Sequence, residues 1–525
     1  MDLHRRTLLA AGALTAGAVL ADPAAAGHVR PWTIPALRRW TPSTGHFTLG
    51  SPARVVVRRD QVDLADEAHQ LAGDLSSVIG GPVQVRVIDG RPREGDVLLR
   101  LGPVGAHLGK EGYRLGVGRS VVVGAHTRAG LFYGGRSLLQ LLHQHRRVPA
   151  GIGHDWPRYA ERGLMLDIGR KHLTYDWIVD RVREMAWLKL NYLHLHFTED
   201  LGFRIESEMS PRVHSEDAFL TKAHVRRLVD LCARHHVQVV PEVDMPAHMG
   251  AALRNYPHLQ LTSALGQAET TKLDYTLPAA REFVQDLVRE YVALFPSRWF
   301  HLGFDEYVAA AQQAQYPQLA SYAQDRFGAG ANNRDGAIGF ANDMVALLRG
   351  LGRRARVYHD GTFGGATQQL DRGAVVEWWT DFSPLGLGSP LPEPQAILDA
   401  GHRIMNIGWY PTYYTNLPAY EPVPRPDLPG FYEDWRVHRF RGVLVAEGDL
   451  GAPYHDIDPH ERANLGSRLS VWFDDPAKET QDQAAAGIHD RLRIMAQQTW
   501  ESRHLVGSYD RFAEIIESVG DCPPE

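Results

Sequence analysis

Cysteine is nearly absent from this chain, since only Cys232 and Cys522 occur among its 525 residues. Two cysteines provide neither a disulfide framework nor a cysteine-based metal site, and they give no indication of redox chemistry. We therefore expect neither a metal nor any other cofactor.

An excess of positive charge is absent as well. The chain has 56 basic and 62 acidic residues, which gives a formal net charge of -6. This balance provides no electrostatic reason to bind nucleic acid or an anionic membrane surface. We expect no nucleic-acid partner, no membrane partner, and a substrate that carries little or no charge.

The apolar run at the start of the chain, residues 8–20, is too short to span a membrane permanently. Arg5-Arg6 precedes it and Ala24-Ala25-Ala26 follows it, which is typical of a twin-arginine signal or a general secretory signal. The sequence therefore predicts an export signal over residues 1–26 and a secreted mature protein.

Residues 32–150 mix strand-like and helical patterns, which predicts a small α+β domain. The expected strands are 53–57, 83–87, 97–101, 113–117 and 120–123, and the expected helices are 64–78 and 129–142. This domain has no clustered acids or histidines and no glycine-rich phosphate loop, so we expect it to support the fold without catalysing a reaction. The segment Pro149–Pro157 contains glycine and proline and is predicted to be a linker.

Residues 158–500 alternate apolar runs with helical periods, which is typical of βα units and a parallel sheet. Eight strands are predicted, at 163–168, 192–197, 237–243, 299–304, 355–359, 374–379, 403–407 and 469–473. Helices are predicted at 177–189, 222–235, 279–295 and 336–351. Eight strands favour a closed (β/α)8 TIM barrel over an open doubly wound sheet. The predicted fold class is therefore α/β, a barrel preceded by an α+β domain; 442–447 is a further candidate strand, and 501–525 a C-terminal extension.

The fourth of these strands ends in two adjacent carboxylates, Asp305 and Glu306. Side chains alternate along a strand, so both can face one pocket only where the strand gives way to a loop. The active sites of (β/α)8 barrels lie at that end of the strands. For an isolated Asp-Glu pair, a solvated strand end is the simpler interpretation.

Other predicted strands also end in polar residues. These are Asp167, Arg170, His194, His196, Glu199, Asp200, Glu242, Asp244, His248 and His301. A structural role competes in each case, because buried histidines are more often hydrogen-bonded than ligands. Similarly, Glu242 and Asp244 could cap the next helix.

Aromatic residues gather at the ends of the later strands. They are Trp378, Trp379, Trp409, Tyr410, Tyr413, Tyr414 and Trp472, the last near Asp474. Core packing is the default for a single aromatic residue. Several rings beside carboxylates, however, suit a pyranose, whose C–H faces stack on flat side chains while its hydroxyls take hydrogen bonds. The pattern indicates a carbohydrate substrate.

Three segments resemble glycoside hydrolase family 20, the β-N-acetylhexosaminidases: RGLMLDIGRKHLTYDWIVDRVREMAWLKLNYLHLHFTEDLGFRIESE, VPEVDMPAHMGAAL and FHLGFDEY. The run EGYRLGVGRSVVVGAHTRAGLFYGGRSLLQLL resembles the end of the N-terminal α+β domain of that family. The resemblance therefore covers about residues 40–480.

The resemblance implies an exo-acting retaining glycosidase that releases terminal β-linked N-acetylhexosamine. The substrate's own 2-acetamido oxygen would attack the anomeric carbon and give an oxazolinium intermediate. Glu306 would act first as general acid and then as general base. Asp305, ionised at the same pH at which Glu306 is protonated, would accept the acetamido N–H and stabilise the intermediate. The two adjacent acids of like charge would help to separate these states.

The same resemblance implies a set of substrate-binding residues. Arg170 would grip hydroxyls at the non-reducing end, where Asp474 would also bind hydroxyls, and Glu199 and His248 would form a polar network beside Asp305.

The acetamido pocket would have aromatic walls. Trp379 and Trp472 would form them, and Tyr413 or Tyr414 would donate a hydrogen bond to the acetamido carbonyl oxygen.

The chain departs from the pattern of this family at four places. It has GFDE where GGDE is common, and Tyr358-His359-Asp360 where Trp-Asp-Glu or Trp-Asn-Asp is usual. Glu199 replaces the first acid of an Asp-Asp pair, and Asp474 replaces a glutamate. These differences affect sugar specificity, and they leave release of a disaccharide, as by a lacto-N-biosidase, as an alternative.

Two hypotheses of other classes remain at this point. His194 and His196 on one barrel strand are how a metal-dependent amidohydrolase would begin its site. A non-catalytic sugar-binding barrel is also possible, because a fold does not determine a function. The intact pair Asp305 and Glu306 argues against the second.

Overall fold

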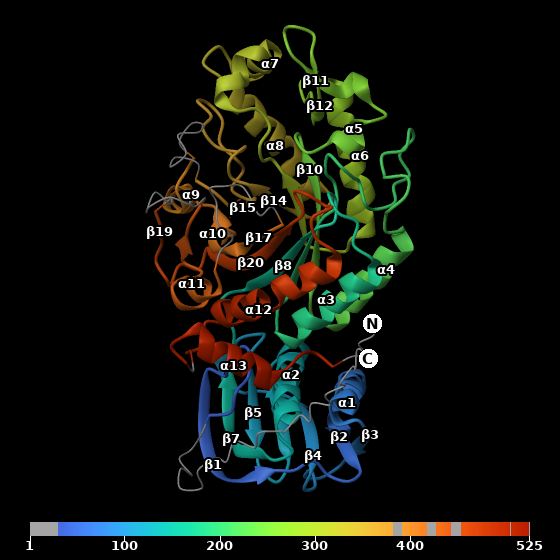
Figure 1. Ribbon diagram of the computed structural model, residues 1–525, viewed down its shortest axis with the longest axis vertical. Coiled ribbons are helices and arrows are strands. Elements are labelled where there is room, and N and C mark those ends of the chain that lie inside the picture. The colour runs from blue at the N-terminus through green and yellow to red at the C-terminus, as the bar shows by residue number, and fades with distance from the viewer. Residues whose placement is uncertain (1–29, 382–390, 417–426, 443–452, 505, 524–525) are drawn as a thin grey trace, which may run out of the picture.

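A computed structural model describes residues 30–381, 391–416, 427–442, 453–504 and 506–523. The predicted export signal lies outside these ranges, as do residues 443–447 of the candidate strand at 442–447. The described chain forms an N-terminal sheet with its helices and a larger α/β part that extends from it (Figure 1). No helix within the described ranges is long and apolar enough to cross a membrane.

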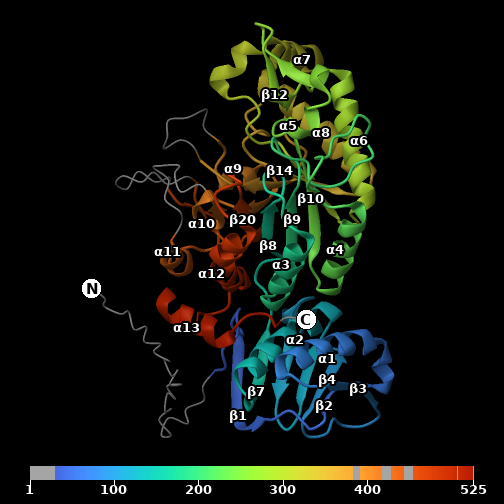
Figure 2. The same cartoon turned by 45° about the vertical axis from the view of Figure 1, so that its right-hand side comes forward.

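The N-terminal part is a seven-stranded sheet in the order β1-β7-β5-β6-β4-β2-β3. Its strands are β1 (Arg39–Phe47), β2 (Ala53–Arg58), β3 (Val83–Ile88), β4 (Asp96–Leu101), β5 (Tyr113–Val117), β6 (Val121–Ala125) and β7 (Val148–Asp155). The helices are α1 (Ala65–Ile79) and α2 (Arg128–Gln144), with short 3-10 turns η1 (Arg59–Leu64) and η2 (Ala106–Leu108). Both α-helices lie on the face of the sheet that is turned toward the larger part (Figure 2). The predicted α+β domain is confirmed.

The predicted linker at Pro149–Pro157 is wrong, because most of it forms β7, which lies between β1 and β5 in the sheet. The glycine at position 151 does not make this segment flexible. It leaves room for the side chain of Trp40 on the neighbouring strand. A Cβ on Gly151 would lie 2.4 Å from the Trp40 ring. Strand β1, which carries Trp40, was not predicted, since RWTPSTGHF has the proline and small polar residues of a turn. An edge strand tolerates such residues.

The larger part is a closed barrel of eight parallel strands. They are β8 (Glu161–Asp167), β9 (Tyr192–His196), β10 (Gln238–Met245), β13 (Trp299–Gly303), β14 (Arg354–Tyr358), β15 (Val375–Trp378), β16 (Arg403–Asn406) and β20 (Asn464–Trp472). The pairing of β16 with β20, and of β20 with β8, closes the sheet. All eight predicted strands and the predicted TIM barrel are confirmed. One more strand, β17 (Tyr413–Thr415), pairs with β20.

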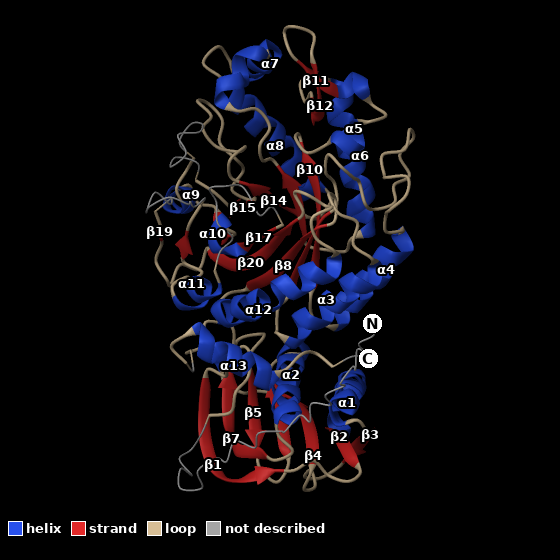
Figure 3. Cartoon of the chain, viewed as in Figure 1, coloured by secondary structure: helices blue, strands red, loops and turns tan. Residues whose placement is uncertain are grey.

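Helices surround the barrel (Figure 3). The longer ones are α3 (Tyr175–Trp187), α4 (Lys222–Arg234), α6 (Pro278–Leu294), α7 (Pro317–Phe327), α8 (Asn333–Gly350), α12 (Gln481–Trp500) and α13 (Tyr509–Val519). Shorter elements are α5 (Gly250–Leu253), α9 (Pro394–Asp399), α10 (Trp409–Thr412), α11 (Leu428–Glu433), η3 (Pro257–Leu259) and η4 (Ala310–Gln315). Two small two-stranded sheets pair β11 (Gln260–Thr262) with β12 (Ala268–Leu273), and β18 (Arg439–Phe440) with β19 (His455–Asp456).

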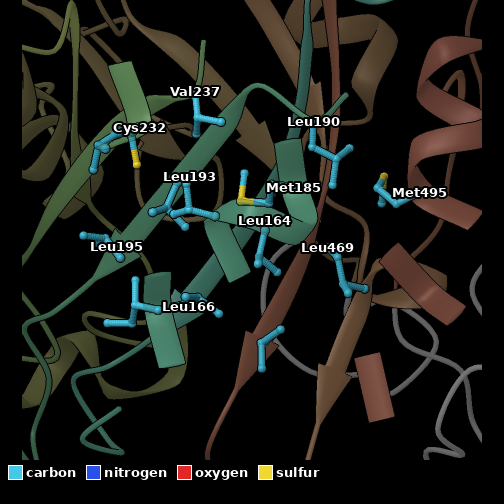
Figure 4. Packing of buried hydrophobic residues seen from close by; sticks show 14 of the residues in the cluster. Leu164, Leu166, Met185, Leu190, Leu193, Leu195, Cys232, Val237, Leu469 and Met495 are labelled. Carbon is cyan, nitrogen blue, oxygen red and sulfur yellow. The ribbon is translucent and has the colours of Figure 1, made fainter. Parts of the chain in front are cut away.

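The alternation of side chains along each strand separates two cores. Leu164 and Leu166 of β8 are fully buried in the cluster that includes Met185 of α3, and Figure 4 shows Leu164 beside Met185. The residue between the two leucines, Met165, lies instead in the barrel interior, with Tyr358 of β14. A strand that is apolar on one face and carries polar groups at its tip can therefore deliver those groups into the barrel mouth.

A buried carboxylate joins the N-terminal sheet to the barrel. Asp155 is fully buried at the end of β7 and accepts hydrogen bonds from the Tyr113 hydroxyl (2.6 Å) and from the Trp500 indole N–H (2.8 Å). The Lys189 ammonium, which follows α3 and is also fully buried, lies 3.1 Å from the same carboxylate. Because these partners belong to both parts, the two parts share one polar junction.

We predict that Asp155→Asn destabilises the protein by about 3–5 kcal/mol, because removal of one charge leaves the Lys189 ammonium buried and unpaired. Urea unfolding followed by circular dichroism measures the change. Asp60→Asn is the matched control, since Asp60 pairs with Arg58 at the surface and an exposed pair contributes about 0–1 kcal/mol. Equal losses in the two variants would contradict the prediction.

Candidate active site

One pocket lies at the carboxyl ends of the barrel strands. Its lining consists of Arg170, His196, Glu199, Asp244, His248, Asp305, Glu306, Trp379, Trp409, Tyr413, Thr415, Trp472 and Asp474. Every site residue predicted from the sequence lines it except Tyr414. The carboxyl end of a barrel is where such a pocket is expected.

The two adjacent carboxylates enter this pocket from a tight turn. Strand β13 ends at Gly303, so Asp305 and Glu306 lie beyond the alternation of the strand, as the sequence predicted. The backbone is left-handed at Phe304 (φ 73°) and at Glu306 (φ 52°), a conformation that residues with a Cβ rarely adopt. Gly303 is required at the start of the turn, because its Cβ would lie 1.5 Å from Asp244 Oδ1.

A second carboxyl, that of Asp244, lies beside Asp305. The sequence analysis found Asp244 at a strand tip but did not assign it to the site. Burial and the neighbouring Asp305 raise the pKa of Asp244 well above its ordinary value. Burial also raises the pKa of Asp305, although the nearby His248 opposes the rise. Two buried carboxyls of like charge hold a proton between them. We infer that Asp244 holds it, because the pKa of Asp244 is raised well above its ordinary value, whereas His248 is the main influence that opposes the rise at Asp305.

His248 lies among three of the acids that line the pocket. Its Nδ1 lies 2.7 Å from Glu199 Oε1, and its Nε2 lies 3.8 Å from Asp305 Oδ2 and 3.6 Å from Glu306 Oε2. Burial lowers the pKa of His248, but the carboxylates of Glu199 and Asp305 raise it by more, so that it lies well above its ordinary value. The imidazole is therefore charged at neutral pH. The network of Glu199 and His248 expected beside Asp305 is present.

The surroundings of Glu306 favour its charged form. Partial burial raises its pKa, but the His248 imidazolium lowers it by more, and the net direction is downward. The side chain is 51% exposed, so water also stabilises the carboxylate. The mechanism implied by the family resemblance needs a protonated Glu306 beside a charged Asp305 when the reaction begins. The His248 cation faces both acids and favours the charged form of each.

Arg170 lines the pocket beside Asp167 and Glu199. Its Nη1 lies 3.0 Å from Asp167 Oδ2, and its Nη2 lies 2.6 Å from Glu199 Oε1. The guanidinium also lies 5.3 Å from the centroid of the Trp472 ring. Despite burial, the acids Asp167, Glu199 and Asp474 raise the pKa of Arg170, so the group is a fixed cation. Such a group can donate hydrogen bonds to substrate hydroxyls.

Aromatic rings form a second wall. Trp379 is parallel to Tyr413, with an interplanar angle of 5° and centroids 6.3 Å apart. Tyr413 also lies 5.8 Å from the centroid of Trp472 and 5.8 Å from that of Trp409. Trp409, found among the aromatic residues of the sequence but given no role, therefore belongs to this wall. Flat apolar faces beside charged groups suit one face of a sugar ring.

Tyr414 does not belong to the pocket, and its prediction as a substrate-binding residue is wrong. Side chains alternate along β17, so Tyr413 and Thr415 face the pocket and Tyr414 faces the other way. Its hydroxyl donates to Glu479 Oε1 at 2.5 Å, and its ring lies against Gly487 of α12. The sequence could not separate the two tyrosines because this short strand was not predicted.

Asp360 was noticed in the sequence only as part of a departure from the family pattern. Its Oδ2 accepts the backbone N–H of Glu306 at 3.0 Å, and its Oδ1 accepts the indole N–H of Trp379 at 2.9 Å. Burial and the nearby Asp305 raise the pKa of Asp360 to about 7. The residue lies directly behind the pocket wall.

The histidines of the strands surround a buried glutamate. Glu242 is 2.6 Å from His196, 3.0 Å from His194 and 2.8 Å from His301. Burial lowers the pKa of His194 to about 3, so its ring is neutral. These nitrogens are at hydrogen-bond distance from the carboxylate and, apart from His196, do not line the pocket. They form a structural centre of the barrel, which does not favour the amidohydrolase hypothesis.

Comparison with known proteins gives two family matches. The model described as glycosyl hydrolase family 20, catalytic domain, matches residues 159–501. The model described as glycosyl hydrolase family 20, domain 2, matches residues 30–156. Together the two matches extend over both parts of the fold.

Individual relatives agree with these matches. The chain is 30% identical over 520 residues to a lacto-N-biosidase of Bifidobacterium bifidum, covering 97% of this chain and 44% of that protein. It is 33% identical over 360 residues to a β-N-acetylhexosaminidase of Cellulomonas fimi, covering 64% of this chain and 66% of that protein. The chain thus spans less than two thirds of the length of either relative.

Solved structures show the same fold. The structure of a β-N-acetylhexosaminidase of Bacteroides fragilis has a TM-score of 0.72 at 21% identity, and the match covers 92% of this chain and 94% of that one.

We predict that the charge on His248 stabilises the folded protein in a pH-dependent way. Because the folded-state pKa lies above the unfolded value of about 6.5, the stabilisation is complete below that pH and is lost as the pH rises through the folded-state pKa. The difference in unfolding free energy between wild type and His248→Gln should therefore be largest at acidic pH. Urea titrations across neutral and alkaline pH measure it, and a difference that does not change with pH would contradict a charged His248.

Proposed function

The chain belongs to glycoside hydrolase family 20, and from that membership we propose that it is an exo-acting retaining glycosidase. It releases terminal β-linked N-acetylhexosamine from oligosaccharides or glycoconjugates, with the substrate's acetamido oxygen as nucleophile. The observation that carries the proposal is the pair Asp305 and Glu306 facing one aromatic-walled pocket. The reaction requires no metal and no other cofactor.

Glu306 is the proposed general acid and base. Its half-exposed carboxylate lines the pocket, where a leaving group can reach it. When a sugar ring covers it and excludes water, the charged form is disfavoured and the pKa of Glu306 rises. Substrate binding therefore favours the protonated acid that the first step needs. After the leaving group departs, the same carboxylate removes a proton from water.

Asp305 is the proposed partner of the acetamido group. As the charged member of the pair with Asp244, it accepts the acetamido N–H and places the carbonyl oxygen beneath the anomeric carbon. The positive charge that develops on the cyclised acetamido group then lies beside a buried carboxylate. A preorganised charge in a site without water is the most effective form of such stabilisation.

Sugar recognition is divided between a polar end and an aromatic wall. Arg170 and Asp474 are proposed to bind the hydroxyls at the non-reducing end. No further sugar residue of the oligosaccharide then fits beyond that end, which makes the enzyme exo-acting. Trp379 and Trp472 enclose the acetamido methyl, and the Tyr413 hydroxyl donates to the acetamido oxygen.

A second candidate function is release of a disaccharide. The match to a lacto-N-biosidase over 97% of this chain favours it. Asp474, where a glutamate is usual, is shorter by one methylene, which leaves more room beside Arg170. The two candidate functions share the same chemistry at Asp305 and Glu306. They differ only in which sugar the part of the pocket beside Arg170 and Asp474 accepts.

Export is a separate proposal. It rests on residues 1–26, which lie outside the described residues, and places the enzyme among extracellular glycans.

We predict that aryl 2-acetamido-2-deoxy-β-glycosides are hydrolysed at least about 10³-fold faster than the corresponding 2-hydroxyl glycosides. A positioned intramolecular nucleophile has an effective molarity of roughly 10⁵–10⁸ M, and only the acetamido substrate provides one. Turnover of gluco, galacto and disaccharide aryl glycosides, each with and without chelator, identifies the released sugar. Equal turnover of the 2-hydroxyl glycoside with a trapped glycosyl-enzyme would refute the mechanism. Complete loss of activity in chelator would favour the amidohydrolase hypothesis, and no turnover of any glycoside would favour a sugar-binding barrel.

The adjacent tyrosines provide a matched pair of variants. We predict that Tyr413→Phe lowers kcat/KM for the acetamido substrate by roughly 10-fold to 100-fold, because a hydrogen bond to a charged group contributes about 1.5–3 kcal/mol. Tyr414→Phe should leave kcat/KM within about 2-fold, since its hydroxyl faces Glu479. Similar losses in both variants would show that the pocket assignment is wrong.

A further inference from the structure

Asp360 contacts the proposed acid and the acetamido wall at the same time. It follows β14, is 9% exposed, and uses each carboxylate oxygen for a different partner. Oδ2 accepts the Glu306 backbone N–H at 3.0 Å, and Oδ1 accepts the Trp379 indole N–H at 2.9 Å. Glu306 follows β13 and Trp379 follows β15, so a single side chain connects groups from two different strands.

The turn that presents Glu306 needs support from outside itself. Phe304 and Glu306 both have positive φ, and neither is a glycine. Such a conformation persists only when its surroundings fix it. The bond from the Glu306 N–H to Asp360 is one such constraint, and it acts on the residue that must deliver a proton.

Asp360 is itself held from behind. Arg334 of α8 donates from Nη1 to the Asp360 carbonyl oxygen at 2.7 Å. Gly361, the next residue, lies so close to the catalytic turn that its Cβ would be 1.7 Å from the Phe304 carbonyl oxygen. The segment at Asp360 and the turn at Glu306 therefore cannot shift independently.

On the other side, the bond from Trp379 sets the position of a ring that faces the substrate. The indole lies parallel to Tyr413 and lines the pocket. The acetamido group packs against this ring in the proposed function. A shift of the Trp379 ring therefore changes the hydrogen bond from its indole N–H to Asp360. Asp360 also accepts the backbone N–H of Glu306, so the shift is passed on to Glu306.

We propose that Asp360 is a positioning residue that couples occupancy of the acetamido pocket to the placement of the acid Glu306. The inference rests on the proposed function and deepens it. A substrate whose acetamido group fills the space against Trp379 keeps both N–H bonds to Asp360, and the Glu306 carboxyl is then aligned with the leaving oxygen. When a substrate fills the space against Trp379 poorly, the bonds to Asp360 are weakened. The Glu306 carboxyl is then displaced from the leaving oxygen.

Asp360→Asn tests the coupling because the amide has nearly the same shape but only one acceptor atom. Its NH2 group would face one of the two N–H donors, so only one bond remains. We expect kcat to fall roughly 10-fold to 100-fold on glycosides with poor leaving groups, part of the roughly 10²- to 10⁴-fold that general acid catalysis supplies. Activated aryl glycosides need little protonation and should lose less than about 3-fold. Glu306→Gln, measured on the same series, gives the limit for complete loss of the acid.

Trp379→Phe gives the decisive measurement, because it removes the indole N–H from a residue that does not touch the leaving group. With coupling through Asp360, this variant also becomes more sensitive to the leaving group, and the double variant with Asp360→Asn is no more sensitive than Asp360→Asn alone. Without coupling, Trp379→Phe raises KM equally for all leaving groups and the two effects multiply. Equal losses across the series or independent effects would overturn the proposal.

Asp371→Asn is the control for the segment between β14 and β15. Asp371 accepts the Gly373 N–H at 2.7 Å and pairs with Arg349, away from the pocket. Its leaving-group dependence should equal that of the wild type. If Asp360→Asn does not fold, Trp379→Phe alone still decides. The proposed function fails in a different way, when the wild type does not hydrolyse acetamido glycosides.

Discussion

The charge on His248 is the interaction on which the rest of the pocket depends. One imidazolium faces Glu199, Asp305 and Glu306, three acids that would otherwise repel one another in a partly closed site. It keeps Asp305 ionised while the proton of the pair stays on Asp244. It also holds Glu306 charged until a substrate arrives. The order in which these groups gain and lose protons therefore follows from one cation and from the exclusion of water.

The barrel brings this cluster together from segments that are far apart in the chain. Arg170 follows β8, Glu199 follows β9, His248 follows β10 and the catalytic turn follows β13. Beneath them, three histidines lie buried around Glu242, each with a ring nitrogen within 3.0 Å of its carboxylate. Polar contacts that do not take part in the reaction therefore join neighbouring strands inside the barrel, and the strand tips carry the groups that do.

The sequence predicted what depends on periodicity and strand ends. Eight apolar runs gave eight strands, and residues placed just after them, such as Arg170 and Asp305, reached the pocket. It failed where packing decides. The glycines of β7 suggested a linker, because the sequence does not show their contact with Trp40 on a neighbouring strand. The pocket-facing tyrosine could not be chosen between Tyr413 and Tyr414, because strand β17 was not predicted. Asp244 and Asp360 were noticed in the sequence but given no role in the site, because each acts on another residue of the site and no local sequence pattern indicates such a contact.

The junction at Asp155 has a consequence for how this chain can vary. Its carboxylate serves donors from α12, from the segment after α3 and from the N-terminal sheet, so neither part has a complete interior when it is alone. A barrel without residues 30–155 would expose the Lys189 ammonium and the Trp500 indole N–H to solvent without their partner Asp155. Substitutions on one side of the junction therefore restrict which residues the other side can accept.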